Sequence, residues 1–171
     1  QAIQLDPTLS ESKNQLAVVL LKSRRCAEAE DLLLEVKKDI FYRTPEFAEH
    51  NLALALDCQG KGPEAVSILE ELVLKRPMFC LGYLTLADVS ARSAKPQACI
   101  DACEGFFTNC AENEEIKDQI SSEHIAMCYL KKGMAHAAMG DVESARASFK
   151  RCQTSGTFGQ ECRRSLNLLP P

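Results

Sequence analysis

The chain contains no tryptophan, and aromatic residues make up only 6% of its 171 positions. It also has no apolar run approaching the roughly 20 residues that a helix needs to cross a bilayer. Basic residues are not in excess, and the net charge is −4. A nucleic-acid-binding surface requires a basic stripe, so this charge balance argues against nucleic acid as a partner.

Sequence patterns for catalysis and metal binding are missing as well. The nine cysteines include no C-x2-C pair, and His50, His124 and His136 are scattered along the chain. No histidine is therefore placed to act as a base for a cysteine nucleophile or to complete a metal-ligand set. The glycines stand alone at turns, and residues 60–65 lack the phosphate-binding loop pattern. We expect no enzymatic activity, no metal and no cofactor.

What the sequence does contain is a pair of amphipathic helical segments between Pro45 and Pro77. Apolar residues recur at helical spacing in both halves. Gly60 and Pro63 separate the halves, because Gly accepts positive φ and Pro fits the first turn of a helix. A helix pair of this length cannot bury its apolar faces alone, so the segment predicts neighbouring copies of itself.

A small residue marks the position where the second helix of a pair must closely approach the first. Ala65 holds that position here, and Ala29, Cys99 and Ala145 hold it in the copies. The step from Ala65 to Cys99 is 34 residues. This pattern resembles the tetratricopeptide repeat, a helix–turn–helix unit of about 34 residues. The resemblance implies an all-α fold, a superhelix (α-solenoid) of about four helical hairpins with a C-terminal capping helix.

We therefore predict a single tetratricopeptide repeat domain over residues 1–171. The charged stretch 111–122 is expected to extend the first helix of the last repeat. Two residues depart from the pattern: Cys103 replaces a large apolar residue, and Lys132 replaces Leu. Residues 2–7 resemble the end of a second helix, so we expect further repeats upstream. The predicted repeats span about 10–43, 46–79, 80–111 and 112–153, and the capping helix about 158–168.

In this repeat the first helices line a groove, and the corresponding positions here are unusually apolar. Repeats that bind a C-terminal carboxylate use Lys and Arg at these positions, and this chain lacks that set. An apolar groove favours an amphipathic helix or an extended hydrophobic segment as partner. The alternative for each residue is packing against adjacent helices. The predicted groove residues are Val18, Leu21, Phe47, Leu54, Leu81, Leu84, Met127, Leu130 and Met134.

Cys152 and Cys162 flank a loop rich in Gly, Ser and Thr. A disulfide between them would fix the capping helix to the last repeat, close a loop of about ten residues and contribute about 2–3 kcal/mol. It would indicate an oxidising compartment such as the bacterial periplasm, whereas free thiols would indicate the cytoplasm. Cys99 and Cys103 occupy core positions of the repeat, so we expect them to be packed as small apolar residues.

Phe41 and Tyr42 lie in a connection longer than a standard inter-repeat turn. We expect both to cap the core between repeats. The alternative is that they form an exposed anchor for a partner.

Residues 32–42 and 49–54 are similar to the pilotin lipoproteins of type IV pili, the PilF/PilW/Tgl group. The resemblance implies a lipoprotein on the periplasmic face of the outer membrane, anchored by a lipid upstream of Gln1. It also implies a role in assembly of the secretin PilQ and in pilus-dependent motility. The alternative is a generic tetratricopeptide adaptor or co-chaperone with an unknown partner, located in the cytoplasm. The matching residues are Asp39, Tyr42, Asn51 and Leu52, with Ala53 in place of the family's Gly.

Overall fold

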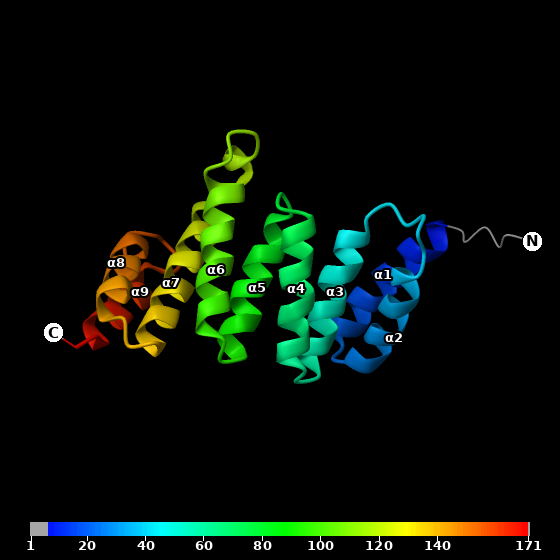
Figure 1. The fold of residues 1–171 in the computed structure, drawn as a ribbon, viewed down its shortest axis with the longest axis horizontal. Coiled ribbons are helices and arrows are strands. Elements are labelled where there is room, and N and C mark those ends of the chain that lie inside the picture. Colours follow the sequence, from blue (N-terminus) through cyan, green and yellow to red (C-terminus); the bar gives the residue numbers. More distant parts are fainter. Residues whose placement is uncertain (1–6, 171) are drawn as a thin grey trace, which may run out of the picture. The chain divides into compact units, whose positions relative to one another are not determined.

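The computed structural model describes residues 7–170, and every regular element in that range is helical (Figure 1). The all-α prediction is therefore confirmed for the described part of the chain. The chain divides into two compact units, one ending at Arg76 and the other beginning at Pro77.

The first unit consists of two helical hairpins. Helix α1 packs on α2, α2 on α3 and α3 on α4, and α1 also contacts α3 directly. The first helix of each hairpin thus lies beside the first helix of its neighbour. The helices are α1 (Pro7–Lys22), α2 (Cys26–Lys37), α3 (Pro45–Cys58) and α4 (Gly62–Lys75).

The second unit repeats the hairpin arrangement and adds a final helix at the position predicted for the cap. Helix α5 packs on α6, α6 on α7 and α7 on α8, while α9 packs on both α8 and α7. The elements are α5 (Cys80–Arg92), α6 (Pro96–Phe106), the π-helical turn η1 (Phe107–Ala111), the 3-10 turn η2 (Lys117–Gln119), α7 (Ser122–Ala138), α8 (Val142–Cys152) and α9 (Gly159–Leu168).

All four hairpin turns are closed in the same way. One residue takes a left-handed conformation, and the next amide donates to the carbonyl five residues earlier at 2.9–3.0 Å. This is the Schellman arrangement, which ordinarily places Gly at the left-handed position. Gly60 and Gly140 fit that rule, but Arg24 and Ala94 adopt φ of 59° and 53° with a side chain present. Such a conformation costs a non-glycine residue about 1–2 kcal/mol.

The small residues singled out by the repeat pattern lie at the contact between the paired helices. Ala29, Ala65, Cys99 and Ala145 are each 0% exposed. A larger side chain there would separate the two helices of the hairpin. The prediction of close approach at these four positions is therefore confirmed.

Three disulfides join helix ends. Cys26 pairs with Cys58, Cys80 with Cys110, and Cys152 with Cys162. The Cα atoms in each pair lie 5.9–6.0 Å apart, an ordinary distance for a disulfide. The last pair is the one that the sequence predicted. The free cysteines are Cys99, Cys103 and Cys128, and all three are buried.

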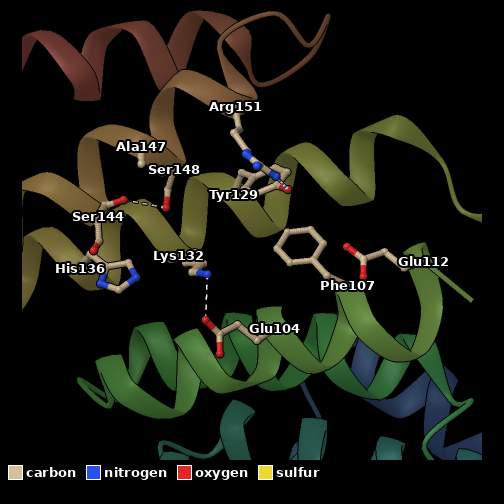
Figure 2. Close-up of a pocket in the computed structure, with 10 residues that line it drawn as sticks. All are labelled: Glu104, Phe107, Glu112, Tyr129, Lys132, His136, Ser144, Ala147, Ser148 and Arg151. Carbon is tan, nitrogen blue, oxygen red and sulfur yellow. Dashed lines mark hydrogen bonds and ion pairs between the residues drawn. The ribbon is translucent and has the colours of Figure 1, made fainter.

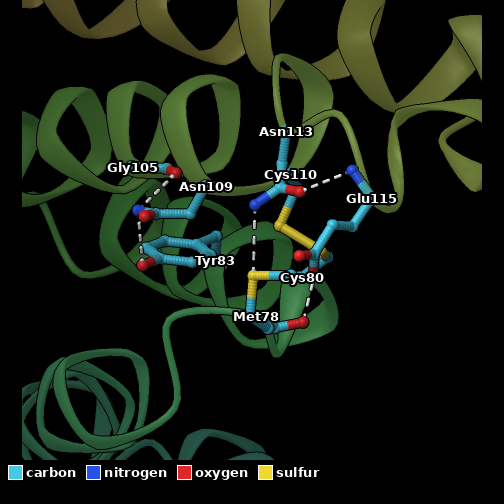
Figure 3. Close-up of a disulfide and its surroundings, with 8 residues drawn as sticks. All are labelled: Met78, Cys80, Tyr83, Gly105, Asn109, Cys110, Asn113 and Glu115. Atoms are coloured by element: carbon cyan, nitrogen blue, oxygen red, sulfur yellow. Dashed lines mark hydrogen bonds between the residues drawn. A yellow bond between two sulfur atoms is a disulfide. The ribbon is translucent and has the colours of Figure 1, made fainter.

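The Cys80–Cys110 disulfide closes the open end of the α5–α6 hairpin (Figure 3). Beside it, the Asn109 side-chain amide donates both to the Tyr83 hydroxyl at 2.9 Å and to the Gly105 carbonyl at 3.0 Å. The Tyr83 ring lies against Gly105, where a Cβ atom would come within 2.5 Å of it. The π-helical turn is thus held by one covalent bond and a tightly packed aromatic ring.

The predicted extension of helix α7 through residues 111–122 is wrong. The chain leaves η1, passes through a bend and the short turn η2, and starts α7 anew. The side-chain oxygen of Asn113 accepts the Glu115 amide at 2.9 Å, a local bond that competes with helix formation. Ser121 then caps α7, its hydroxyl accepting the His124 amide at 3.3 Å.

Replacing Gly133 by Ala should destabilise the second unit. A Cβ atom at this position would lie 2.5 Å from the buried Phe149 ring, so the ring or a helix must shift. Overpacking costs about 1–3 kcal/mol and outweighs the roughly 1 kcal/mol gained by replacing a helical Gly. We expect the urea midpoint to fall for Gly133→Ala. Gly156→Ala is the control, because no described atom lies within 4 Å of its Cβ. Equal midpoints would contradict the packing described here.

Thiol counting tests the three disulfides directly. After expression with export to an oxidising compartment, the denatured, unreduced chain should react with iodoacetamide at Cys99, Cys103 and Cys128 only. Prior reduction should raise the modified number to all nine cysteines. The mass difference between the two samples gives the count, and nine modifications without reductant would contradict the pairing.

Candidate partner-binding site

Helices α1 and α3 enclose a hollow of about 330 Å³ within the first unit. We refer to it as the α1–α3 hollow. It brings together three of the predicted groove residues, two from α1 and one from α3. The full lining is Val18, Leu21, Lys22, Arg24, Asn51, Leu54 and Cys58.

The apolar walls of the hollow come from helical spacing. Val18 and Leu21 are three residues apart, so they lie on one face of α1, opposite Leu54 on α3. All three side chains are half-buried, which leaves apolar surface accessible to a partner. This is the part of the predicted groove that the structure brings together.

A buried amide pair fixes the two helices beneath the hollow. The Asn51 side-chain amide donates to the Asn14 side-chain oxygen at 2.9 Å. Both residues are buried, so the hydrogen bond pairs two polar groups that are shielded from water. It also fixes the register of α3 on α1. His50 is buried next to this pair, and its Nδ1 lies 3.4 Å from the Asn51 oxygen.

The rim of the hollow is basic. Lys22 and Arg24 are exposed at the C-terminal end of α1. Within residues 7–170 neither of them takes part in an ion pair. Among the described lining residues these two carry positive charge, and none carries a negative charge.

The other predicted groove residues differ in how much of the side chain is exposed. Leu84 and Leu130 are only 8% and 4% exposed, which favours the alternative that they pack against adjacent helices. Leu130 packs in a core cluster with Phe149 and Ala145, and α7 covers α5 in the second unit. The exposed members are Phe47, Leu81 and Met134, and Met127 is half-buried.

Phe41 and Tyr42 differ in burial in the structure. Tyr42 is buried, and its hydroxyl donates to the Glu11 carboxylate at 3.0 Å, so it does cap the core. Phe41 is 61% exposed, and the prediction that it packs in the core is therefore wrong. Its neighbour Ile40 is also exposed, so this connection presents two apolar side chains to solvent.

A second hollow, of about 450 Å³, lies in the second unit, and no sequence pattern predicted it (Figure 2). Its base is α7, and its walls are α6 with η1 on one side and α8 on the other. Small residues on α8 leave the space open. The lining residues are Glu104, Phe107, Glu112, Tyr129, Lys132, His136, Ser144, Ala147, Ser148 and Arg151.

The polar groups of this second hollow are largely paired with one another. Lys132, the residue that departs from the repeat pattern, forms an ion pair with Glu104 at 2.9 Å. Arg151 donates to the Tyr129 hydroxyl at 2.8 Å. The Tyr129 ring in turn stacks on Phe107 at 4.5 Å between centroids. Among the described lining residues, Glu112 is exposed and forms no ion pair, so the unmatched charge of this hollow is negative, unlike the basic rim of the α1–α3 hollow.

The free thiols are not arranged for catalysis. A hydrogen bond with Cys103, together with burial, raises the pKa of Cys99. A hydrogen bond with Cys128 is the main cause that raises the pKa of Cys103. Both thiols stay protonated, and a protonated thiol is a poor nucleophile. Across residues 7–170, no group of His, Cys, Asp and Glu side chains is placed to hold a metal ion.

The described helices also include none that is long and apolar enough to span a membrane.

Comparison with known proteins identifies the fold. No family model and no curated protein matches the chain. Among solved structures, PilW, a widely conserved type IV pilus biogenesis factor, matches at TM-score 0.75 and 18% identity over 96% of this chain and 70% of PilW. Nearly identical TPR-like repeats of a candidate kinesin light chain from Podosopora anserina match at TM-score 0.72 and 18% identity, over 95% of this chain and 86% of theirs. A thermophilic TPR protein of Thermus thermophilus matches at TM-score 0.61 and 18% identity, over 92% of this chain and 79% of that protein.

The chain has the tetratricopeptide repeat fold. At 18% identity these likenesses show the fold alone. The function must therefore be argued from the surface of this chain.

Stability should fall at mildly acidic pH because of His50. Burial lowers the pKa of His50 below its ordinary value of 6.5. The unfolded chain therefore takes up a proton near pH 6.5 that the folded chain takes up only at lower pH. The stability contributed by the neutral ring is complete above pH 6.5 and is lost as the pH falls toward the lower, folded pKa.

Urea unfolding at about pH 7.5 and about pH 5.5 measures this effect. We expect the loss of unfolding free energy between the two pH values to be about 1 kcal/mol greater for the wild type than for His50→Gln. The exposed His124 supplies the control, His124→Gln, which should keep the wild-type pH dependence. An unchanged pH dependence in His50→Gln would contradict the assignment.

Proposed function

We propose that this chain is a protein–protein interaction module of the pilotin type, which binds an apolar segment of an outer-membrane secretin in the α1–α3 hollow. The observation that carries the proposal is the convergence of Val18, Leu21 and Leu54 on one accessible hollow. The likeness to PilW and the sequence resemblance to pilotin lipoproteins favour a secretin as the partner.

The hollow suits an apolar side chain rather than a charged one. Burying one Val or Leu side chain contributes about 1.5–3 kcal/mol, which alone gives weak binding. Additional contact is available on α3, where the exposed Phe47 lies seven residues before Leu54. Two turns of helix separate these residues by about 10 Å, close to the spacing of i and i+7 anchors on a helical partner.

The cysteines favour an oxidising compartment. Three disulfides in one small domain are typical of secreted and periplasmic proteins and rare in the cytoplasm. A periplasmic location at the outer membrane, through a lipid anchor upstream of Gln1, belongs to the same proposal. Such a module would assist secretin assembly and thereby pilus-dependent motility.

Charge placed in the hollow should prevent binding. Leu54→Glu puts a carboxylate among apolar walls, where a partner side chain would have to desolvate it. We expect the Kd for the purified secretin subunit to rise at least about tenfold, and secretin multimers to decrease in cells. Leu74→Glu is the matched control, because Leu74 is 81% exposed on α4 and does not line the hollow.

Circular dichroism of both variants checks that the helices remain folded. Wild-type secretin affinity in a folded Leu54→Glu variant would rule out the α1–α3 hollow as the binding site. A wild-type protein that fails to bind secretin would rule out the partner.

A further inference from the structure

The two cations on the rim of the α1–α3 hollow have no charged partner in the described structure. Lys22 closes α1, and Arg24 follows two residues later in the hairpin turn. Some exposed cations of this unit are paired, Arg25 with Glu28 and Lys75 with Glu71. Lys37, Lys38 and Arg43 are also exposed and form no ion pair within residues 7–170, but they do not line the hollow. What distinguishes Lys22 and Arg24 is their position, because both line the α1–α3 hollow beside its apolar walls.

The hairpin turn does not explain why an arginine stands at position 24. Arg24 adopts a φ of 59° in a turn whose counterparts Gly60, Ala94 and Gly140 adopt the same left-handed conformation. The hydrogen bonds of the turn are the same in each case, so the turn itself does not require an arginine. Neither the turn nor its strain accounts for the guanidinium, which Arg24 places at the rim of the hollow.

We infer that the segment bound in the α1–α3 hollow carries an Asp or Glu side chain next to its apolar anchor, and that Arg24 and Lys22 bind this carboxylate. The inference rests on the proposed function. Arg and carboxylate form paired, charge-assisted hydrogen bonds that fix orientation as well as position. The apolar walls would thus hold the anchor, and the rim would select an acidic neighbour.

A structural role for the same cations is the competing explanation, since positive charge stabilises the C-terminal end of a helix. The second unit offers a matched control. Ala94 occupies the equivalent turn position with φ of 53°, but it carries no charge and lies outside the hollow. Replacing Ala94 by Gly therefore relieves strain without removing a charge, whereas replacing Arg24 by Gly does both.

The experiment compares secretin-subunit binding and thermal unfolding of five proteins: wild type, Arg24→Gly, Arg24→Gln, Lys22→Gln and Ala94→Gly. Both Gly variants should raise Tm by a few degrees because they relieve the left-handed strain. Only the three variants that remove a rim charge should weaken binding, each by about three- to tenfold in about 50 mM NaCl. Raising NaCl to about 500 mM should weaken wild-type binding and have much less effect on an Arg24→Gln/Lys22→Gln double variant.

Equal affinity in all five proteins, with Leu54→Glu still defective, would overturn the inference and leave the proposed function standing. An affinity loss in Ala94→Gly equal to that in Arg24→Gly would also overturn it, because the charge would not be the cause. A wild-type protein without affinity for secretin would overturn both.

Discussion

The close approach of paired helices is the constraint on which the rest of the structure depends. One small, fully buried residue per hairpin makes this approach possible: Ala29, Ala65, Cys99 and Ala145. Each hairpin can then turn within a few residues, and the hairpins within each unit can pack on one another. The same spacing brings the first helices α1 and α3 side by side in the first unit, which is what creates the α1–α3 hollow.

The fold produces two hollows with different chemistry. In the first unit, aliphatic side chains remain half-buried over a satisfied Asn14–Asn51 pair, and the cations at the rim are unmatched. In the second unit, side chains such as Lys132 and Arg151 lie in the hollow and pair with their neighbours. The two hollows therefore differ in the charge and the apolar surface that they leave accessible.

The local features of the fold could be predicted from the sequence, but the contacts between distant segments could not. The small residues, the turn glycines and the Cys152–Cys162 pair could be predicted because each depends on spacing along the chain. The Cys26–Cys58 and Cys80–Cys110 pairs join helix ends 32 and 30 residues apart, so their partners emerge only from the tertiary packing. Burial of Leu130 depends likewise on α8, and the break at Asn113 on one side-chain hydrogen bond. Periodicity locates a helix face without showing which neighbour covers it.

Methyl NMR of the folded protein tests the central claim most directly. Titration with the purified secretin subunit should shift or broaden the methyl signals of Val18, Leu21 and Leu54, which line the accessible hollow. The methyl signals of the buried Leu130 should remain unchanged. Shifts confined to residues outside the hollow, with these three signals unaffected at saturation, would contradict the account.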